Sequence, residues 1–290
     1  MKKVSILILI IFWIVNNAWT QDNTPVSENF EKGFYAGAAI GFGFGLCYYD
    51  PCCYYDESNY SPSYDMVKGI SLMWGRGING TISGGYNFNK YLGVNLAVRD
   101  FWGLKVKKTS DGSSGSEGGS YFTETNTFQP MVLQVIPSVV ISPGFDDFNP
   151  YARIGASIGV YPAVYRKELQ TTEQATGSST TNYQGVYYGH IPIGFDVAGG
   201  VQWNFADNMN IFAELDFSGM NYTPSHYKLT KYSVDGVDKF GDLTNKQKYI
   251  DFVKSYDKAE TIPDDSHNKR LRESFPLTGI GLNVGFTMKF

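Results

Sequence analysis

Apolar and non-apolar residues alternate without a break over the C-terminal segment of the chain. One face of residues 278–290 carries only apolar side chains, while the other carries mostly glycine and small residues. Such alternation predicts a β-strand, because successive side chains of a strand point to opposite faces. The wet face of a soluble sandwich would usually carry Lys, Glu and Thr, whereas glycines suit a crowded barrel interior.

The same alternation recurs in seven other segments. They are residues 33–45, 80–89, 91–102, 131–142, 151–161, 190–205 and 210–218. Most of them set apolar residues against glycine or polar residues, whereas 131–142 is apolar on both faces. Together with the terminal segment they predict eight strands.

The lengths of the connections favour one architecture for these strands. Short connections at three places alternate with long ones, which span about 46–77, 108–120, 167–182 and 231–275. An antiparallel transmembrane barrel has short turns on one rim and longer extracellular loops on the other. We therefore predict an all-β chain that forms an eight-stranded antiparallel up-and-down transmembrane β-barrel with long extracellular loops. A soluble eight-stranded barrel is the alternative, but nothing requires its loops to segregate in this way.

Composition excludes two other classes. Aromatic residues make up 16% of the chain and charged residues 18%, with 32 Gly, which is too much apolar surface for a disordered protein. No internal run reaches the ~20 apolar residues that a membrane helix needs.

The N-terminus has the three parts of a secretory signal peptide. Lys2 and Lys3 precede the apolar run Val4–Val15, and the small-residue site Ala18-Trp19-Thr20 follows. We expect cleavage, with residues 1–20 as signal peptide, 21–32 as a periplasmic segment and 33–290 as the barrel; a membrane anchor is the alternative. Without Lys2 and Lys3, 22 basic residues face 28 acidic ones, a net charge of about −6 that disfavours nucleic acid.

The signal peptide, the eight alternating strands and a last strand ending in Phe290 resemble the small outer-membrane β-barrels of Gram-negative bacteria, the OmpA-like and OmpX-like transmembrane barrels. The resemblance covers nearly all of residues 33–290, although no peptidoglycan-binding domain follows and two loops are unusually long. It implies a location in the outer membrane, contact with outer-membrane lipids and recognition by the barrel-assembly machinery. Phe286, Met288 and Phe290 match the family's terminal assembly signal.

The first long connection is dense in tyrosine. It contains Tyr48, Tyr49, Tyr54, Tyr55, Tyr60 and Tyr64. Tyrosine presents a flat apolar face and a hydroxyl at low entropic cost, so this loop is a candidate surface for a host or cell-surface protein or glycan. An aromatic belt at the membrane rim and packing within the loop are equally good explanations.

Three cysteines lie in the same connection, at Cys47, Cys52 and Cys53. Export implies an oxidising compartment, so one disulfide with one thiol left over is the expected arrangement. No histidine lies nearby, which makes a metal site a weak hypothesis. We expect no metal and no cofactor.

The other long connections differ in composition. Ser110–Ser120 is rich in Gly and Ser, and Thr171–Asn182 in Thr and Ser, so both are expected to be mobile and solvated. In the last connection Thr244 and Gln247 resemble a capping box, and apolar residues from Tyr249 to Tyr256 recur at helical spacing. This pattern predicts a possible short amphipathic helix that caps the barrel, lies on headgroups, meets a partner or folds on its own loop.

A catalytic site finds little support. A lipid-modifying hydrolase would need a histidine beside a serine nucleophile and an orienting carboxylate. Ser225 and His226 are adjacent, but neighbouring side chains of a strand point to opposite faces. We therefore assign no catalytic residue.

Strand parity places five charged residues in the barrel interior: Arg99, Arg153, Asp196, Glu214 and Asp216. An unpaired charge in a narrow interior is costly, so we expect Arg99 to pair with Asp196 or Asp216, and Arg153 with Glu214. Separate solvation of each charge in a small water-filled cavity is the alternative.

These observations favour a structural or surface-interaction role of adhesion type, carried by the extracellular loops. The alternatives are a small-solute channel and a lipid-modifying outer-membrane enzyme. An eight-stranded barrel is about wide enough to be filled by its own side chains, which counts against a general porin.

Overall fold

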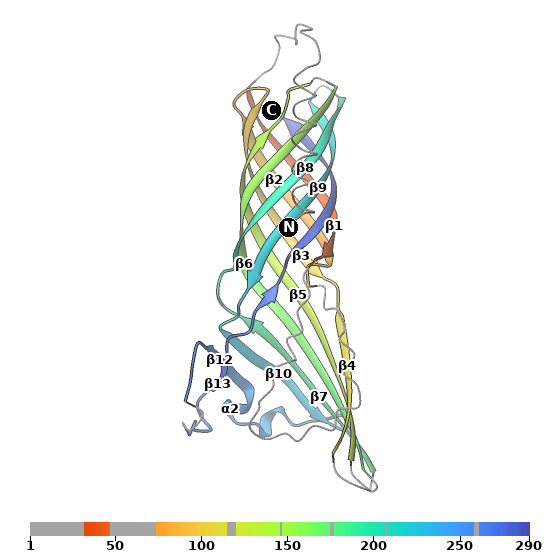
Figure 1. Ribbon diagram of the computed structural model, residues 1–290, viewed down its shortest axis with the longest axis vertical. Helices are drawn as coiled ribbons and strands as arrows, with labels where there is room; N and C mark the ends of the chain where they lie inside the picture. The colour runs from red at the N-terminus through yellow and green to blue at the C-terminus, as the bar shows by residue number, and fades with distance from the viewer. Residues whose placement is uncertain are drawn as a thin grey trace, which may run out of the picture.

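The computed structural model describes residues 32–46, 74–114, 120–145, 147–174, 177–206, 208–257 and 261–290. Eight antiparallel strands close into a ring in the order β1-β2-β3-β5-β6-β8-β9-β15, and β15 pairs with β1 (Figure 1). They are β1 Gly33–Gly45, β2 Gly77–Asn87, β3 Leu92–Gly103, β5 Ser120–Ile141, β6 Phe148–Gln174, β8 Ile193–Ala206, β9 Met209–Tyr222 and β15 Gly279–Lys289. Each of the eight segments predicted from alternation overlaps one of these strands, and where the bounds differ it is by one to three residues at an end of the predicted segment or by a strand that runs further than predicted.

The alternation sorts side chains between the outside and the inside of the ring. Along β3, Leu92, Val94 and Leu96 are exposed while the residues between them are buried. In β15 the exposed positions are likewise the apolar ones, and the buried positions include Asn283 and Thr287. The ring is therefore apolar outside and polar inside, the reverse of a soluble barrel.

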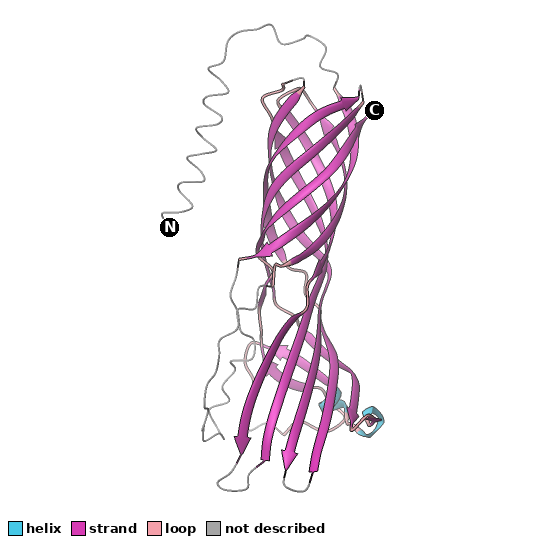
Figure 2. Ribbon diagram, turned by 90° about the vertical axis from the view of Figure 1, so that its right-hand side faces the viewer, coloured by secondary structure: helices cyan, strands magenta, loops and turns pink. Residues whose placement is uncertain are grey.

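Two ring strands, β5 and β6, continue beyond the ring and, with five further strands, form an open sheet that we call the extension. It is ordered β4-β5-β6-β7-β10-β12-β13 and occupies the lower half of Figure 2, beyond the rim opposite the C-terminus. The added strands are β4 Val106–Ser114, β7 Gly177–Tyr188, β10 His226–Val234, β12 Tyr249–Val253 and β13 Asn268–Leu271. Short elements complete it: β11 Val237–Asp238, the 3-10 helix η1 Phe240–Asp242 and α2 Asn245–Lys248. One more short strand, β14 Phe275–Pro276, pairs with the end of ring strand β9.

The extension corrects one expectation. The Gly/Ser-rich and Thr/Ser-rich connections were expected to be mobile, but their described residues form the hairpins β4–β5 and β6–β7. These strands pair with their neighbours in continuous register, and Thr suits a pleated surface even where no apolar alternation is present.

The predicted amphipathic helix is wrong over most of its length. Gln247 Oε1 accepts a hydrogen bond from the Thr244 backbone N–H at 2.9 Å, and helix α2 follows for only four residues. Tyr249, Ile250 and Val253, which have helical spacing, instead lie in β12. This strand pairs with β10 on one side and with β13 on the other. Two neighbouring strands satisfy more backbone groups of this segment than one further helical turn would.

A bulge joins the ring to the extension. In the β5–β6 ladder Leu133 pairs with Val160 but Met131 pairs with Ala163, so β6 carries one extra residue. Tyr161 lies in this bulge with a φ of 55° and is 83% exposed.

The helices of the described residues are all too short to span a membrane.

Candidate functional site: a sealed lumen and an extended sheet

The outer wall of the ring is a continuous apolar band. Ile40 is 70% exposed, Ile82 65% and Leu215 60%, each on a different strand. Exposed aromatic residues mark both ends of the band: Phe34, Phe88, Tyr91, Phe148, Phe205 and Phe290 toward the short turns, and Phe44, Trp102, Tyr161 and Phe195 toward the extension. An apolar band between two aromatic girdles is the surface that a transmembrane barrel presents to lipid.

Arg99 bridges two carboxylates in the middle of the lumen. Its Nη1 lies 2.9 Å from Asp196 Oδ2 and 2.9 Å from Asp216 Oδ2. The three side chains come from β3, β8 and β9 and are at most 5% exposed. One guanidinium therefore links strands that lie apart in the ring.

Arg153 on β6 extends this group toward the short turns. Its Nη2 donates to Glu214 Oε1 at 3.0 Å, and its Nη1 forms an ion pair with Asp196 Oδ1 at 2.8 Å. Asp196 is thus shared by both arginines. The structure brings together all five charged residues that parity placed in the interior.

Polar residues without a formal charge complete the network, and sequence analysis did not identify them. Asn283 Nδ2 donates to Asp216 at 2.9 Å and to Glu214 at 3.2 Å, and its Oδ1 accepts from Asn79 Nδ2 at 3.2 Å. Tyr151 OH donates to Glu214 at 2.9 Å. Two guanidinium groups face three carboxylates, so these neutral donors stabilise the excess negative charge. The alternation along their strands places these polar residues on the inner face, and this pattern could have identified them from the sequence.

Two small cavities lie on either side of the network. Arg153 and Glu214 line a cavity of about 90 Å³ on the side of the short turns. Arg99 and Asp216 line a second cavity of about 40 Å³ on the side of the extension. Each is large enough for a few water molecules, and the charged network separates them.

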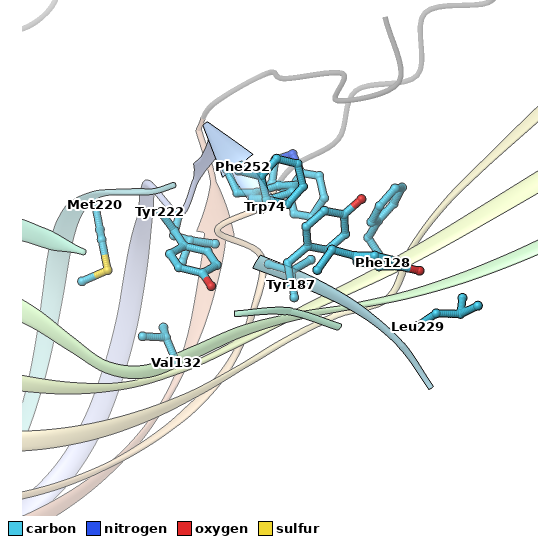
Figure 3. Close-up of a cluster of buried hydrophobic side chains, with 12 residues drawn as sticks. Trp74, Phe128, Val132, Tyr187, Met220, Tyr222, Leu229 and Phe252 are labelled. Carbon is cyan, nitrogen blue, oxygen red and sulfur yellow. The ribbon is translucent and has the colours of Figure 1, made fainter. Parts of the chain in front are cut away.

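An apolar cluster closes the mouth of the ring toward the extension (Figure 3). Trp74 and Phe275 are fully buried, with ring centroids 5.0 Å apart, and Phe275 also contacts Tyr187 at 5.2 Å. The other buried members are Phe128, Val132, Val164, Met220, Tyr222, Tyr227, Leu229, Phe252 and Leu277. The lumen is therefore closed twice, by ion pairs at its middle and by aromatic packing at its mouth.

The inner face of the extension carries a second charged group. Arg166 Nε donates to Asn126 Oδ1 at 2.9 Å, and its Nη2 lies 2.6 Å from Glu168 Oε2. Burial raises the pKa of the Glu168 carboxyl, although Arg166 acts to lower it; burial likewise raises the pKa of Glu273. These contacts join strands β5 and β6 and hold the sheet together.

Two histidines converge on one aspartate near the edge of the extension. His226 Nδ1 lies 2.8 Å from Asp251 Oδ1, and His267 Nδ1 lies 3.1 Å from the same oxygen. Burial acts to raise the pKa of Asp251, but the hydrogen bonds from both histidines outweigh it and lower that pKa. The group links β10, β12 and the residue before β13. Among the described residues, no three His, Cys, Asp or Glu side chains are arranged to hold a metal ion.

Several residues singled out by the sequence can be placed only in part. Phe286, Met288 and Phe290 lie on the outer face of the last strand, with Phe290 76% exposed. The signal peptide, the six loop tyrosines and the three cysteines lie outside the described residues.

A comparison with protein-family models identifies an outer-membrane barrel domain in this chain. A family model described as "Outer membrane protein beta-barrel domain" matches residues 16–244. A search of curated proteins finds no match. Among solved structures, Neisserial surface protein A has 13% identity and a TM-score of 0.32, covering 89% of this chain and 97% of its own.

Ail, the attachment invasion locus protein of Yersinia pestis, has 11% identity and a TM-score of 0.35, covering 90% of this chain and 100% of its own. One Ail structure contains the heparin analogue sucrose octasulfate. At these values no ligand or activity transfers to this chain. The family match covers well over half of the sequence, and the chain therefore belongs to the outer-membrane β-barrel domain family and is a protein of the cell outer membrane.

Proposed function

We propose that this protein is a cell-surface interaction protein, in which the barrel is an anchor and the extension is the binding platform. The observation that carries this proposal is the continuity of β5 and β6, which run from the lipid-facing wall into the extension as single strands, with one bulge at the junction. The family's topology puts the long connections outside the cell, so the extension is extracellular. A rigid sheet held clear of the membrane suits recognition of a neighbouring surface.

The two seals argue against a small-solute channel. An ion or sugar would have to break ion pairs between buried groups and then displace the aromatic cluster at the mouth. Both steps are costly in a medium of low dielectric constant. The barrel therefore contributes anchorage rather than transport.

A hydrolytic activity is disfavoured by the surroundings of His226. Asp251 orients its Nδ1, as a triad would require. Within the part of the chain that the structure describes, however, no serine hydroxyl donates to its other ring nitrogen. We accordingly propose a non-enzymatic role.

The partner proposed for the extension is a protein or glycan on a host or neighbouring cell. The tyrosine-rich loop remains a second candidate surface, and one disulfide among Cys47, Cys52 and Cys53 remains the proposed pairing. Residues 1–20 are proposed to be removed on export.

Shortened hairpins test this proposal directly. Lys107 pairs with Thr127, and Lys167 pairs with Gln184, so residues 108–126 and 168–183 can each be replaced by Asn-Gly without changing the remaining register. Cells that display the shortened protein should lose most of their attachment to host cells or to neighbouring bacteria.

Heat-dependent electrophoretic migration would verify that the shortened barrel still folds in the membrane. Deletion of residues 50–65 serves as a matched comparison for the tyrosine-rich loop. Unchanged attachment with the shortened hairpins would reject the extension as the platform, and loss only on deletion of 50–65 would move the role to that loop.

A further inference from the structure

Three lysines form a row across the outer face of the extension. The strand register aligns Lys107 on β4, Thr127 on β5, Lys167 on β6, Gln184 on β7 and Lys231 on β10. Lys107, Lys167 and Lys231 are exposed. Two strand spacings separate successive lysines, so their Cα atoms are roughly 10 Å apart.

A fourth cation lies in the adjacent row. Lys228 on β10 pairs with Val186 of β7, and Tyr165 of β6 pairs with the same valine. Lys228 is exposed, and its Nζ lies 5.8 Å from the centre of the Tyr249 ring. The patch therefore presents four cations beside the exposed ring of Tyr165.

No carboxylate of the described residues forms an ion pair with any of these lysines. Two carboxylates lie near the patch on this face: Asp251 of β12, which pairs with His226 two residues from Lys228, and Asp111 of β4, which pairs with Thr123 of β5. Thr123 lies four residues beyond Thr127, or about 13 Å along the strand, and Asp111 already accepts a hydrogen bond from Thr123 at 2.8 Å. Asp251 in turn is bound by His226 and His267, so the three lysines of the row have no carboxylate partner within the described residues.

The position of the row relative to the membrane limits the kinds of ligand that it can reach. The face that carries it is continuous with the lipid-facing wall, because Leu133, Met131 and Thr127 follow each other on one face of β5. Met131 pairs with the girdle residue Trp102, and Thr127 is four residues further on. With the usual barrel tilt, Thr127 lies about 10 Å above the end of the apolar band, at the level of the headgroups. The same tilt inclines the row, so its lysines lie at different heights from this level outward.

We propose that this lysine patch binds the phosphorylated sugar headgroups of glycolipids in the outer leaflet around the barrel. Ammonium groups attract phosphates, and the intervening Thr127 and Gln184 can donate or accept hydrogen bonds with sugar hydroxyls. A protein partner would need several apolar anchors, but polar Thr127 and Gln184 lie between the lysines and Tyr165 in the adjacent row is the one aromatic ring described beside them. Binding would fix the height of the extension above the membrane, independently of what the extension recognises.

The test uses the full-length protein in detergent, with lipid A carrying two phosphates as the probe and dephosphorylated lipid A as its control. Retained lipid is measured by native mass spectrometry. The wild type should retain the phosphorylated form preferentially, and this preference should weaken as salt rises. K107Q/K167Q should lower retention about fivefold for each lysine replaced.

Matched variants separate charge at this patch from charge in general. K239Q/K254Q removes two exposed lysines elsewhere in the extension and should retain the lipid like the wild type. K107R/K167R keeps the charge and should also retain it, which covers the case in which K107Q/K167Q fails to fold.

Three outcomes would overturn the proposal. One is equal retention of the two lipid A forms by the wild type, and another is equal loss in K107Q/K167Q and K239Q/K254Q. The third is lysine-dependent binding of soluble dextran sulfate without preference for phosphorylated lipid A, which would assign the patch to a free polyanion. Cell attachment is measured separately, so loss of lipid retention alone leaves the proposed function standing.

Discussion

At the scale of single residues, Arg99 is the group on which the interior depends most. Among the residues that the structure describes, it is the one side chain that forms an ion pair with both Asp196 and Asp216, and all three are buried. Arg99→Ala leaves two carboxylates without their shared cation, so we expect a loss of about 3–5 kcal/mol in the free energy of unfolding. Urea denaturation in detergent micelles measures this loss.

Lys90→Ala is a suitable comparison for that variant. Lys90 lies over the Tyr91 ring, 5.0 Å from its centre, at a short turn outside the lumen. Its replacement should change stability by less than about 0.5 kcal/mol. Equal effects of the two variants would show that the buried network does not hold the ring together.

The contribution of Asp251 to the stability of the folded protein should depend on pH. Its pKa is lowered in the folded protein, so its stabilising contribution is complete above the unfolded value of about 3.9 and disappears as pH falls through the lower folded value. Asp251→Asn should therefore reduce hydrogen-exchange protection of β12 and β13 at pH 7, and wild type and variant should converge once the pH falls below the lowered pKa of Asp251. Asp265→Asn, at an exposed aspartate of the same region, should leave protection unchanged at both pH values.

At the scale of elements, the last strand closes the ring and ends at an exposed aromatic residue. Phe286 pairs with Ala38 and is 50% exposed on the lipid-facing wall. Replacing Phe286 and Phe290 by Asp should prevent insertion, because a charge on the lipid face costs up to about 2–4 kcal/mol near the midplane and less at the interface. Fractionation of cells followed by heat-dependent migration measures insertion. Normal accumulation in the outer membrane would contradict an assembly role for this strand end.

At the scale of the whole molecule, the two seals predict that the barrel conducts poorly. Purified protein in a planar bilayer should show little steady conductance, and Arg99→Ala should either destabilise the barrel or raise conductance. A Trp74→Ala variant, which opens only the apolar seal, should leave the ion-pair seal in place and conduct little. Large steady conductance of the wild type would overturn the sealed lumen and favour the channel alternative.

The sequence by itself determined the ring, its two faces and the inward position of the five charged residues. Alternation is a local property of each strand, and the lipid outside the ring demands it at every second position. The alternating connection lengths then left few arrangements of the eight strands.

Only the tertiary structure decided how far the strands extend and which polar groups meet. Beyond the membrane no lipid face is required, so β4 and β7 form without an apolar alternation that a reader of the sequence could find. Tyr249–Val253 has helical spacing, but pairing with β10 and β13 makes it a strand. Arg99 and Arg153 both contact Asp196 because their side chains extend across a narrow lumen. The lumen exists only when the ring closes, so no local sequence pattern could predict these contacts.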